Sequence, residues 1–219
     1  MKTVHAFFIG LLVLGSFGMP AMASEKSPAA SSTVSLQKLI EGNKRYIDAK
    51  TTHPDQSVQR RAEVAKGQHP FAVIVCCSDS RLPPEIIFDQ GLGDLFVIRL
   101  AGNIMDDAAL GSIEYAVEHL GVNLVMILGH ERCGAVEATI KGGEAPGHIG
   151  SLVKAIQPAV DKAKKQPGDL TDNVVRENIK MIVQQVTSSE PILSELAKSG
   201  ALSVIGARYD LDDGVVEVQ

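Results

Sequence analysis

Tryptophan is absent from this chain of 219 residues, and aromatic residues make up only 4% of it. The formal net charge is −5 at pH 7, and lysine and arginine form no cluster along the sequence. Proteins that bind nucleic acids or anionic membranes usually carry a basic surface. We therefore expect no nucleic acid among the partners of this protein and, once its leader is removed, no membrane.

Cysteine is also scarce. The three positions, Cys76, Cys77 and Cys133, are too few for the disulfide framework of a small exported domain. Beyond the N-terminal segment, no stretch approaches the roughly 18 consecutive apolar residues that predict a transmembrane helix. The length that remains after the leader suits one domain with a sizeable core.

The N-terminal segment has the pattern of a secretory signal peptide. Lys2 gives a basic start, residues 7–14 are apolar, and Ala21, Met22 and Ala23 form an A-x-A cleavage site. We expect residues 1–23 to be removed, residues 24–33 to form a flexible tail, and residues 34–219 to form a single domain. The mature protein is then periplasmic or secreted.

The rest of the chain alternates between strand and helix patterns, which predicts an α/β fold. Strands joined by helices pair in parallel through right-handed crossovers. We expect a mostly parallel, four-stranded central sheet flanked by helices, with an N-terminal helical extension and a C-terminal edge strand after a hairpin turn at 212–214. The predicted strands are 71–77, 95–99, 123–128, 201–207 and, at the edge, 215–218. The predicted helices are 34–50, 58–67, 108–120, 133–141, 149–164, 170–188 and 191–199.

Polar side chains follow two of these strands. Cys77 follows the first, and His130 and Cys133 follow the third, with His130 on the closing loop and Cys133 at the start of a helix. Because parallel strands open on the same edge of a sheet, where such folds bind ligands, these residues can converge. Two thiolates and one imidazole suit zinc, and three protein ligands leave the open position of a catalytic site.

Other interpretations of the cysteines remain. Cys77 and Cys133 could form a disulfide in an oxidising compartment, which would leave His130 without a role. Cys76 points to the opposite side of the strand from Cys77, and we interpret it as a small apolar filler. An anion-binding phosphatase or rhodanese-like loop needs an arginine six residues after its cysteine, whereas Arg81 follows Cys76 by five and Cys77 by four.

Three blocks of this sequence together resemble the signatures of the β-class carbonic anhydrases. They are CSDSR at 77–81, RLAGN at 99–103 and GHERCG at 129–134, and the resemblance extends from about residue 34 to the closing strands at 206–210 and 214–217. It implies one zinc ion per chain and the reversible hydration of carbon dioxide to bicarbonate by a zinc-bound hydroxide. It also implies that Asp79 accepts a hydrogen bond from that hydroxide and that Arg81 orients Asp79.

The resemblance extends to a substrate pocket. Gln68, Phe96 and Tyr115 match positions that line an apolar pocket in the plant-type branch, although a loop amide, a core phenylalanine and a helix-face tyrosine are equally good interpretations. In that branch the counterpart of Gln68 comes from a neighbouring subunit, which implies a homodimer or a dimer of dimers. The helix at 34–50 could lie across that partner. The backbone N–H of Gly134, at a helix N-terminus, can meet a bicarbonate oxygen.

Two other functions remain open at this point. The same scaffold can hydrolyse carbon disulfide or a similar linear triatomic molecule, since only the pocket entrance would differ. A non-catalytic zinc or thiol module is the third reading, but metal storage does not require the pairing of Asp79 with Arg81. No residue is a convincing proton shuttle, and His69 is a weak candidate. Arg99 has a structural rather than a catalytic pattern, and Gly102 and Asn103 shape the turn after the second strand.

Overall fold

The computed structural model describes residues 31–219 of the chain. The predicted signal peptide therefore lies outside the described residues, as does most of the predicted tail. Five strands form one sheet in the order β2-β1-β3-β4-β5. Their bounds are Ala72–Cys76 for β1, Leu95–Arg99 for β2, Leu124–His130 for β3, Ser203–Tyr209 for β4 and Val216–Val218 for β5. The first four pair in parallel, and β5 pairs antiparallel with β4.

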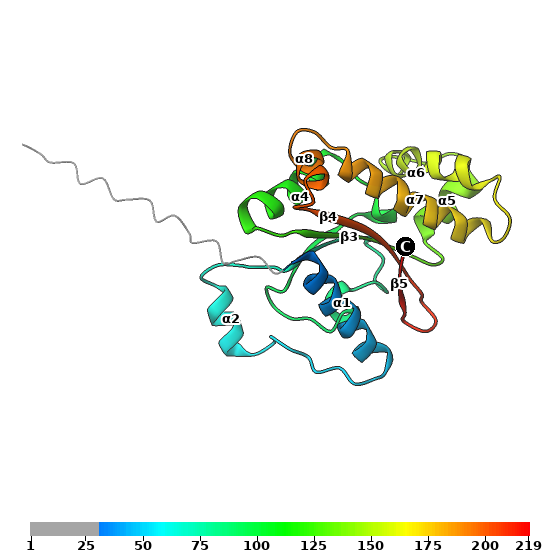
Figure 1. The fold of residues 1–219 in the computed structure, drawn as a ribbon. Coiled ribbons are helices and arrows are strands. Elements are labelled where there is room, and N and C mark those ends of the chain that lie inside the picture. The colour runs from blue at the N-terminus through cyan, green and yellow to red at the C-terminus, as the bar shows by residue number, and fades with distance from the viewer. Residues whose placement is uncertain (1–30) are drawn as a thin grey trace, which may run out of the picture.

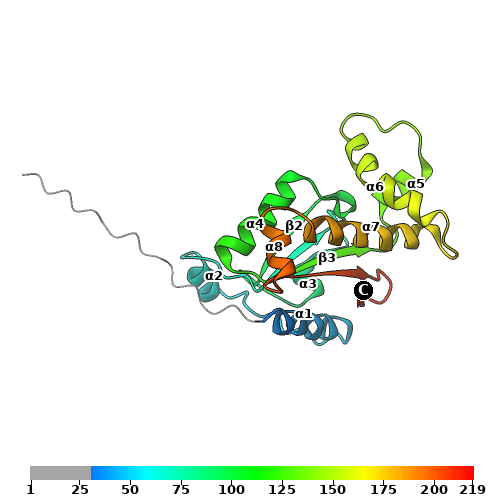
Figure 2. The same cartoon turned by 45° about the horizontal axis from the view of Figure 1, so that its top comes forward.

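Helices cover both faces of the sheet. In Figures 1 and 2, α7 lies on one face and α1 on the opposite one, while α5 and α6 extend past the end of the sheet. All residues of β1 and β3 are buried, as expected for strands covered on both faces, and both are rich in valine, isoleucine and leucine. The helices span Ser32–Ile47 (α1), Val58–Val64 (α2), Pro84–Ile87 (α3), Asp107–Leu120 (α4), Gly134–Lys141 (α5), Ile149–Ala163 (α6), Leu170–Thr187 (α7) and Ile192–Lys198 (α8), with a 3-10 turn at Ala101–Asn103 (η1).

The predicted fold class is confirmed, and each predicted strand and helix is present. The main differences lie at the ends. Helix α1 begins at Ser32, capped by the Ser31 side chain, so the end of the predicted tail is helical. Strand β3 continues to His130, because its last two residues pair with Arg208 and Tyr209 of β4. His130 thus ends the strand, and the prediction that it lies on the following loop is wrong.

The N-terminal extension is part of the core of its own chain. Leu39 is completely buried, and Asn43 donates hydrogen bonds to the carbonyls of Ile87 and Gly214. The side-chain Oδ1 of Asn43 in turn accepts a hydrogen bond from the N–H of Val216. Helix α1 therefore connects α3 to the β4–β5 hairpin, although Val34, Ile40 and Ile47 leave part of its surface apolar and exposed. In residues 31–219 no helix has the length and apolarity that a membrane span requires.

Candidate metal centre

The candidate ligands lie where the chain reverses direction across the sheet. From β1 the chain first adds β2 on one side and later β3 on the other, so the ends of β1 and β3 are adjacent. Such a switch point is the usual ligand-binding place in open α/β folds. Cys77 directly follows β1, His130 ends β3, and Cys133 is the N-terminal capping residue of α5. The structure therefore brings all three predicted ligand residues together.

Their geometry fits a metal ion. The ligand atoms of Cys77, His130 and Cys133 all lie within 4.8 Å of one another, and the two sulfur atoms are 4.0 Å apart. Zinc bonds to sulfur of about 2.3 Å at a tetrahedral angle correspond to a sulfur separation of roughly 3.8 Å. The cysteines are free thiols, and their spacing is far from the roughly 2.05 Å of a disulfide bond, so the disulfide interpretation is wrong.

Histidine 130 provides an independent test of the fit. Its side chain is fully buried, and its Nε2 atom has no hydrogen-bond partner among the described residues. Nδ1 lies 2.7 Å from the carbonyl of Glu131 and must carry the proton, because a carbonyl oxygen only accepts. Nε2 is then a buried lone pair facing two sulfur atoms. A buried acceptor without a partner is costly, and a metal ion would satisfy it.

The two thiols influence each other's ionisation. The hydrogen bond from Cys133 lowers the pKa of Cys77, against the burial that raises it. The same contact with Cys77 raises the pKa of Cys133, and burial adds to this effect. The first thiolate therefore forms readily, whereas the second needs a cation. Metal binding to such a pair releases protons. Cys76 is completely buried and lies outside the candidate ligand group, and burial raises its pKa to about 12; these features agree with its interpretation as an apolar filler.

Asp79 and Arg81 form a two-pronged ion pair beside the ligands. Arg81 Nε donates to Asp79 Oδ1 at 3.0 Å and Nη2 donates to Oδ2 at 2.8 Å, while the Arg81 N–H also donates to Oδ1. The guanidinium holds the pKa of Asp79 well below its usual range, although burial acts in the opposite direction. Oδ2 of Asp79 lies 3.8 Å from Nε2 of His130. An ionised, oriented carboxylate therefore faces the candidate metal position.

Backbone contacts hold the Cys77 loop in place. Arg99 donates to the carbonyls of Cys77 and Asp79, which supports its structural role. The N–H of Gly102 donates to the Cys77 sulfur at 3.2 Å. Gly102 has a φ of +67°, and a Cβ there would lie 2.6 Å from the Ile156 side chain, so only glycine suits this turn. The Cys77 sulfur thus accepts a hydrogen bond from the backbone in addition to facing the candidate metal position.

Comparison with known proteins agrees with this geometry. The carbonic anhydrase family profile matches residues 72–216. The chain belongs to the carbonic anhydrase family. It is 41% identical over 191 residues to Carbonic anhydrase 2 of Mycobacterium tuberculosis, a match that covers 85% of this chain and 92% of that relative.

Solved structures assign the class within the family. The beta-carbonic anhydrase CcaA has a TM-score of 0.67 and 29% identity, with 84% of this chain and 94% of that one covered. A Coccomyxa beta-carbonic anhydrase in complex with acetazolamide has a TM-score of 0.67 and 28% identity, with coverage of 84% and 85%. Together these comparisons support carbonic anhydrase activity and the β class.

The predicted substrate residues of this carbonic anhydrase lie in a more exposed environment than the buried candidate ligands. Gln68 is exposed on the segment between α2 and β1, and Gly134 is exposed at the start of α5. Phe96 and Tyr115 are neighbours, with ring centroids 6.4 Å apart, and Tyr115 is 48% exposed on α4. Phe96 precedes the end of β2 by three residues, or about 10 Å along the strand. Within one chain these aromatic rings lie back from the strand ends, and their role in the pocket stays a prediction.

A surface hollow of about 330 Å³ is lined by both sequence neighbours of Gln68 but not by Gln68 itself. Arg60, Lys66 and His69 line it together with Glu63, Val64 and Gly67, and the metal-centre residues do not. His69 is exposed there, and the structure gives it no contact with the metal centre, so it remains a weak candidate for a proton shuttle.

Several residues around the carbonic anhydrase site do not stand out in the sequence. Asn178 of α7 donates to the Gly102 carbonyl, and Arg208 of β4 contacts Glu131 next to the His130 ligand. Asn178 gives no local signal, because it acts across 76 residues. Arg208 gives a weak one, since an arginine near the end of a strand beside Asp210 indicates a charged cluster at the same sheet edge.

Proposed function

We propose that this chain catalyses the reversible hydration of carbon dioxide to bicarbonate and a proton at the centre formed by Cys77, His130 and Cys133. The observation that carries the proposal is the ion pair of Asp79 with Arg81, whose carboxylate lies 3.8 Å from the free imidazole nitrogen. A storage or structural metal site has no need of an oriented, ionised acceptor. Membership of the carbonic anhydrase family supports the same activity.

Zinc is the cofactor that these donors suit, with one ion per chain held by the two sulfur atoms and Nε2 of His130. It tolerates sulfur and nitrogen ligands together and has no redox chemistry. When bound, the ion supplies the acidity that makes water a nucleophile at neutral pH. The lowered pKa of Cys77 favours the thiolate that binds a metal ion, and the proton on Nδ1 of His130 leaves Nε2 free to act as a ligand.

Asp79 and Arg81 provide orientation rather than proton transfer. Because its pKa is depressed, Asp79 stays ionised and accepts a hydrogen bond from the attacking water without taking up its proton. The fork of Arg81 prevents the carboxylate from rotating, which leaves one lone pair of the nucleophile directed at carbon dioxide. The N–H of Gly134, at the N-terminus of α5, can donate a hydrogen bond to the developing bicarbonate oxygen.

We further propose that the active form is a homodimer or a dimer of dimers in which Gln68 of one chain completes the site of another. The exposure of Gln68 and Tyr115 is consistent with residues that a second copy would cover. The exposed apolar positions Val34, Ile40 and Ile47 on α1 offer a surface for that contact. A twofold arrangement is the commonest solution for such an interface.

Export is a separate part of the proposal. The leader pattern in residues 1–23 supports cleavage after Ala23 and a periplasmic or secreted mature chain. N-terminal sequencing of the exported protein tests this directly. A mature chain that still begins at Met1 would contradict it.

The activity is tested by stopped-flow measurement of carbon dioxide hydration on zinc-loaded protein. Asp79→Asn keeps the size of the side chain but loses its charge, and we expect kcat/KM to fall by about 100-fold or more with zinc retained. Asp48→Asn is a matched control, because Asp48 is an exposed carboxylate that pairs with Lys44 and does not belong to the candidate ligand group. Near-normal hydration by Asp79→Asn would refute the proposed role. Faster turnover of carbon disulfide by the wild type would instead favour the alternative substrate.

A further inference from the structure

Residues 130–133 run from the last residue of β3 to the N-terminal capping residue of α5 and include two of the three candidate ligands; we call them the ligand loop. Its conformation depends on its surroundings. Arg132 has a φ of +46°, a left-handed conformation that is uncommon for a residue with a side chain. Its carbonyl accepts a hydrogen bond from Arg81 Nη2 at 3.3 Å, and its guanidinium makes a two-pronged pair with Asp212. Neighbouring groups must hold such a turn in place.

Glu131 is the residue that directs His130. Its carbonyl accepts the Nδ1 proton, so the orientation of this one peptide group decides where Nε2 points. The Glu131 N–H donates to the Tyr209 carbonyl at 3.1 Å. Its carboxylate accepts from Arg208 Nη2 at 2.6 Å and from the N–H of Leu211 at 3.1 Å. Both the main chain and the side chain of Glu131 are therefore attached to β4 and the turn after it.

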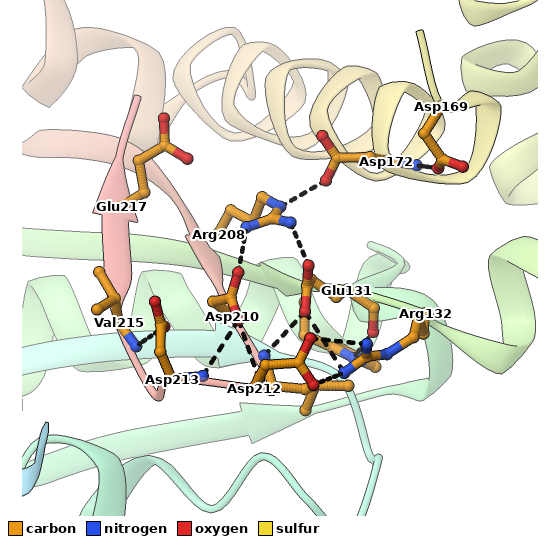
Figure 3. A network of polar contacts seen from close by, with 12 residues as sticks. Glu131, Arg132, Asp169, Asp172, Arg208, Asp210, Asp212, Asp213, Val215 and Glu217 are labelled. Carbon is orange, nitrogen blue, oxygen red and sulfur yellow. Dashed lines mark hydrogen bonds and ion pairs between the residues drawn. The ribbon is translucent and has the colours of Figure 1, made fainter.

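Arg208 is the centre of this attachment. Its side chain is only 11% exposed and lies among the carboxylates of Glu131, Asp172 and Asp210, as Figure 3 shows. Asp172 lies in the first turn of α7, and its second oxygen accepts from Arg176, which also pairs with Glu217 of β5. Removing a partly buried partner leaves the opposite charges uncompensated. Arg208 thus joins the ligand loop to α7 and to the end of β4.

We propose that Arg208 and Glu131 are positioning residues for the metal centre. Arg208 holds the Glu131 side chain, the Glu131 carbonyl holds Nδ1 of His130, and Nε2 is thereby directed at the ion. This inference rests on the proposed metal-dependent function and adds two residues that do not touch the metal or the substrate. Groups that orient a metal-bound histidine typically change metal affinity by about 10- to 100-fold when they are removed.

The test measures metal affinity directly. Zinc dissociation constants are obtained by competition with a chromogenic chelator for the full mature chain and for Glu131→Gln, Glu131→Ala and Arg208→Met. The visible absorption of each cobalt-substituted protein reports the ligand geometry. Thermal unfolding of each metal-free protein shows whether the variant folds. Arg176→Gln is the matched control, because it removes a neighbouring ion pair with Asp172 that does not contact Glu131.

We expect Arg208→Met and Glu131→Ala to bind zinc about 10-fold more weakly and to shift the cobalt spectrum. Glu131→Gln should have a smaller effect, since its amide oxygen can still accept from Leu211, and Arg176→Gln should bind as the wild type does. Unchanged zinc affinity and cobalt spectra in folded variants would overturn the inference, as would an equal loss in Arg176→Gln. If Arg208→Met fails to fold, Glu131→Gln and Glu131→Ala decide. A wild type that binds no zinc would instead refute the proposed metal site.

Discussion

The adjacent ends of β1 and β3 contrast with the outer surface formed by β2, α4 and the segment before β1. At the strand ends Cys77, His130 and Cys133 are at most 4% exposed, and contacts within the same chain orient Cys77 and His130. On the outer surface Gln68 is exposed and Tyr115 is 48% exposed. In the first region, the candidate ligands are buried and held in place without any contribution from a second chain. The second is what a site completed by another chain would leave uncovered, and the following experiments test that difference.

The largest effect is expected from removing a ligand. Cys77→Ser, His130→Ala and Cys133→Ser should each weaken zinc binding by more than the roughly 10- to 100-fold typical of an outer-shell partner, because a direct donor is lost. Metal content after dialysis measures this. Cys76→Ala is the control, since Cys76 is adjacent and buried but outside the ligand group, and should retain about one zinc per chain. Full retention in all three ligand variants would refute the site.

A smaller effect is expected from changing Arg81, which orients Asp79 but does not bind the metal ion. Arg81→Ala should keep its zinc and lose kcat/KM by about 10- to 100-fold, because Asp79 is then free to rotate. Arg81→Lys should recover only part of the rate, since lysine keeps the charge without the two-pronged geometry. Stopped-flow hydration measures both. Near-normal rates in both variants would show that the ion pair is only a loop contact.

The comparison between the regions becomes sharpest in a subunit-complementation experiment. Gln68→Ala should lower hydration by about 10-fold, and Cys77→Ser should abolish it. In a mixed dimer the intact metal centre of one chain receives Gln68 from the other, so co-expression restores about a quarter of the sites if pairing is random. Activity no higher than the average of the separate variants would mean that Gln68 does not serve a neighbouring chain.

The sequence was informative about the strand ends for a physical reason. Cys77 directly follows an apolar run, and His130 and Cys133 are three residues apart, so local pattern and parallel pairing are enough to bring them together. The same reasoning missed α3, a single turn of four residues after Pro83, and η1. It also ended β3 too early, because only pairing with β4 extends that strand to His130.

Contacts between distant parts of the chain were less accessible to such reasoning. The bonds from Asn178 to Gly102 and from Arg208 to Glu131 span 76 and 77 residues, and neither pair has a characteristic spacing. The role of α1 shows the same limit. Its apolar face predicted a helix, but its attachment to α3 and to the β4–β5 hairpin through Asn43 depends on tertiary structure. A truncation that removes α1 would therefore damage the fold as well as any dimer contact.

The smallest effect on activity is expected from changing Asp89, which forms hydrogen bonds to the chain segment that leads to Gln68. Its buried carboxylate accepts hydrogen bonds from Arg45 Nε, from the N–H and hydroxyl of Thr52, and from the N–H of His53. Burial alone would raise the pKa of Asp89, but the bonds from Thr52, Arg45 and His53 outweigh it and lower the pKa to about 2. The folded protein thus favours the ionised carboxylate more than the unfolded chain does.

The sign of the pH dependence follows from that depressed pKa. The stabilising contribution of Asp89 is fully present above its ordinary pKa, and is lost as pH falls from about 4 to about 2. Asp89→Asn should therefore lower the free energy of unfolding by about 1 to 3 kcal/mol at pH 7, with a difference that shrinks toward pH 2. Asp48→Asn, which removes the exposed pair with Lys44, should leave the free energy of unfolding nearly unchanged.

Denaturant unfolding from pH 7 to pH 2 measures this difference, and hydration assays on the same variant relate it to the two regions. If Asp89 only fastens the outer segment, Asp89→Asn keeps its full zinc content, because the ligand residues depend on other contacts. Any loss of hydration rate in Asp89→Asn should then result from a displaced Gln68. In the double variant with Gln68→Ala, the two losses of rate should not add, since coupled residues are non-additive. A stability difference between wild type and variant that stays constant down to pH 2 would contradict the assignment to Asp89 ionisation.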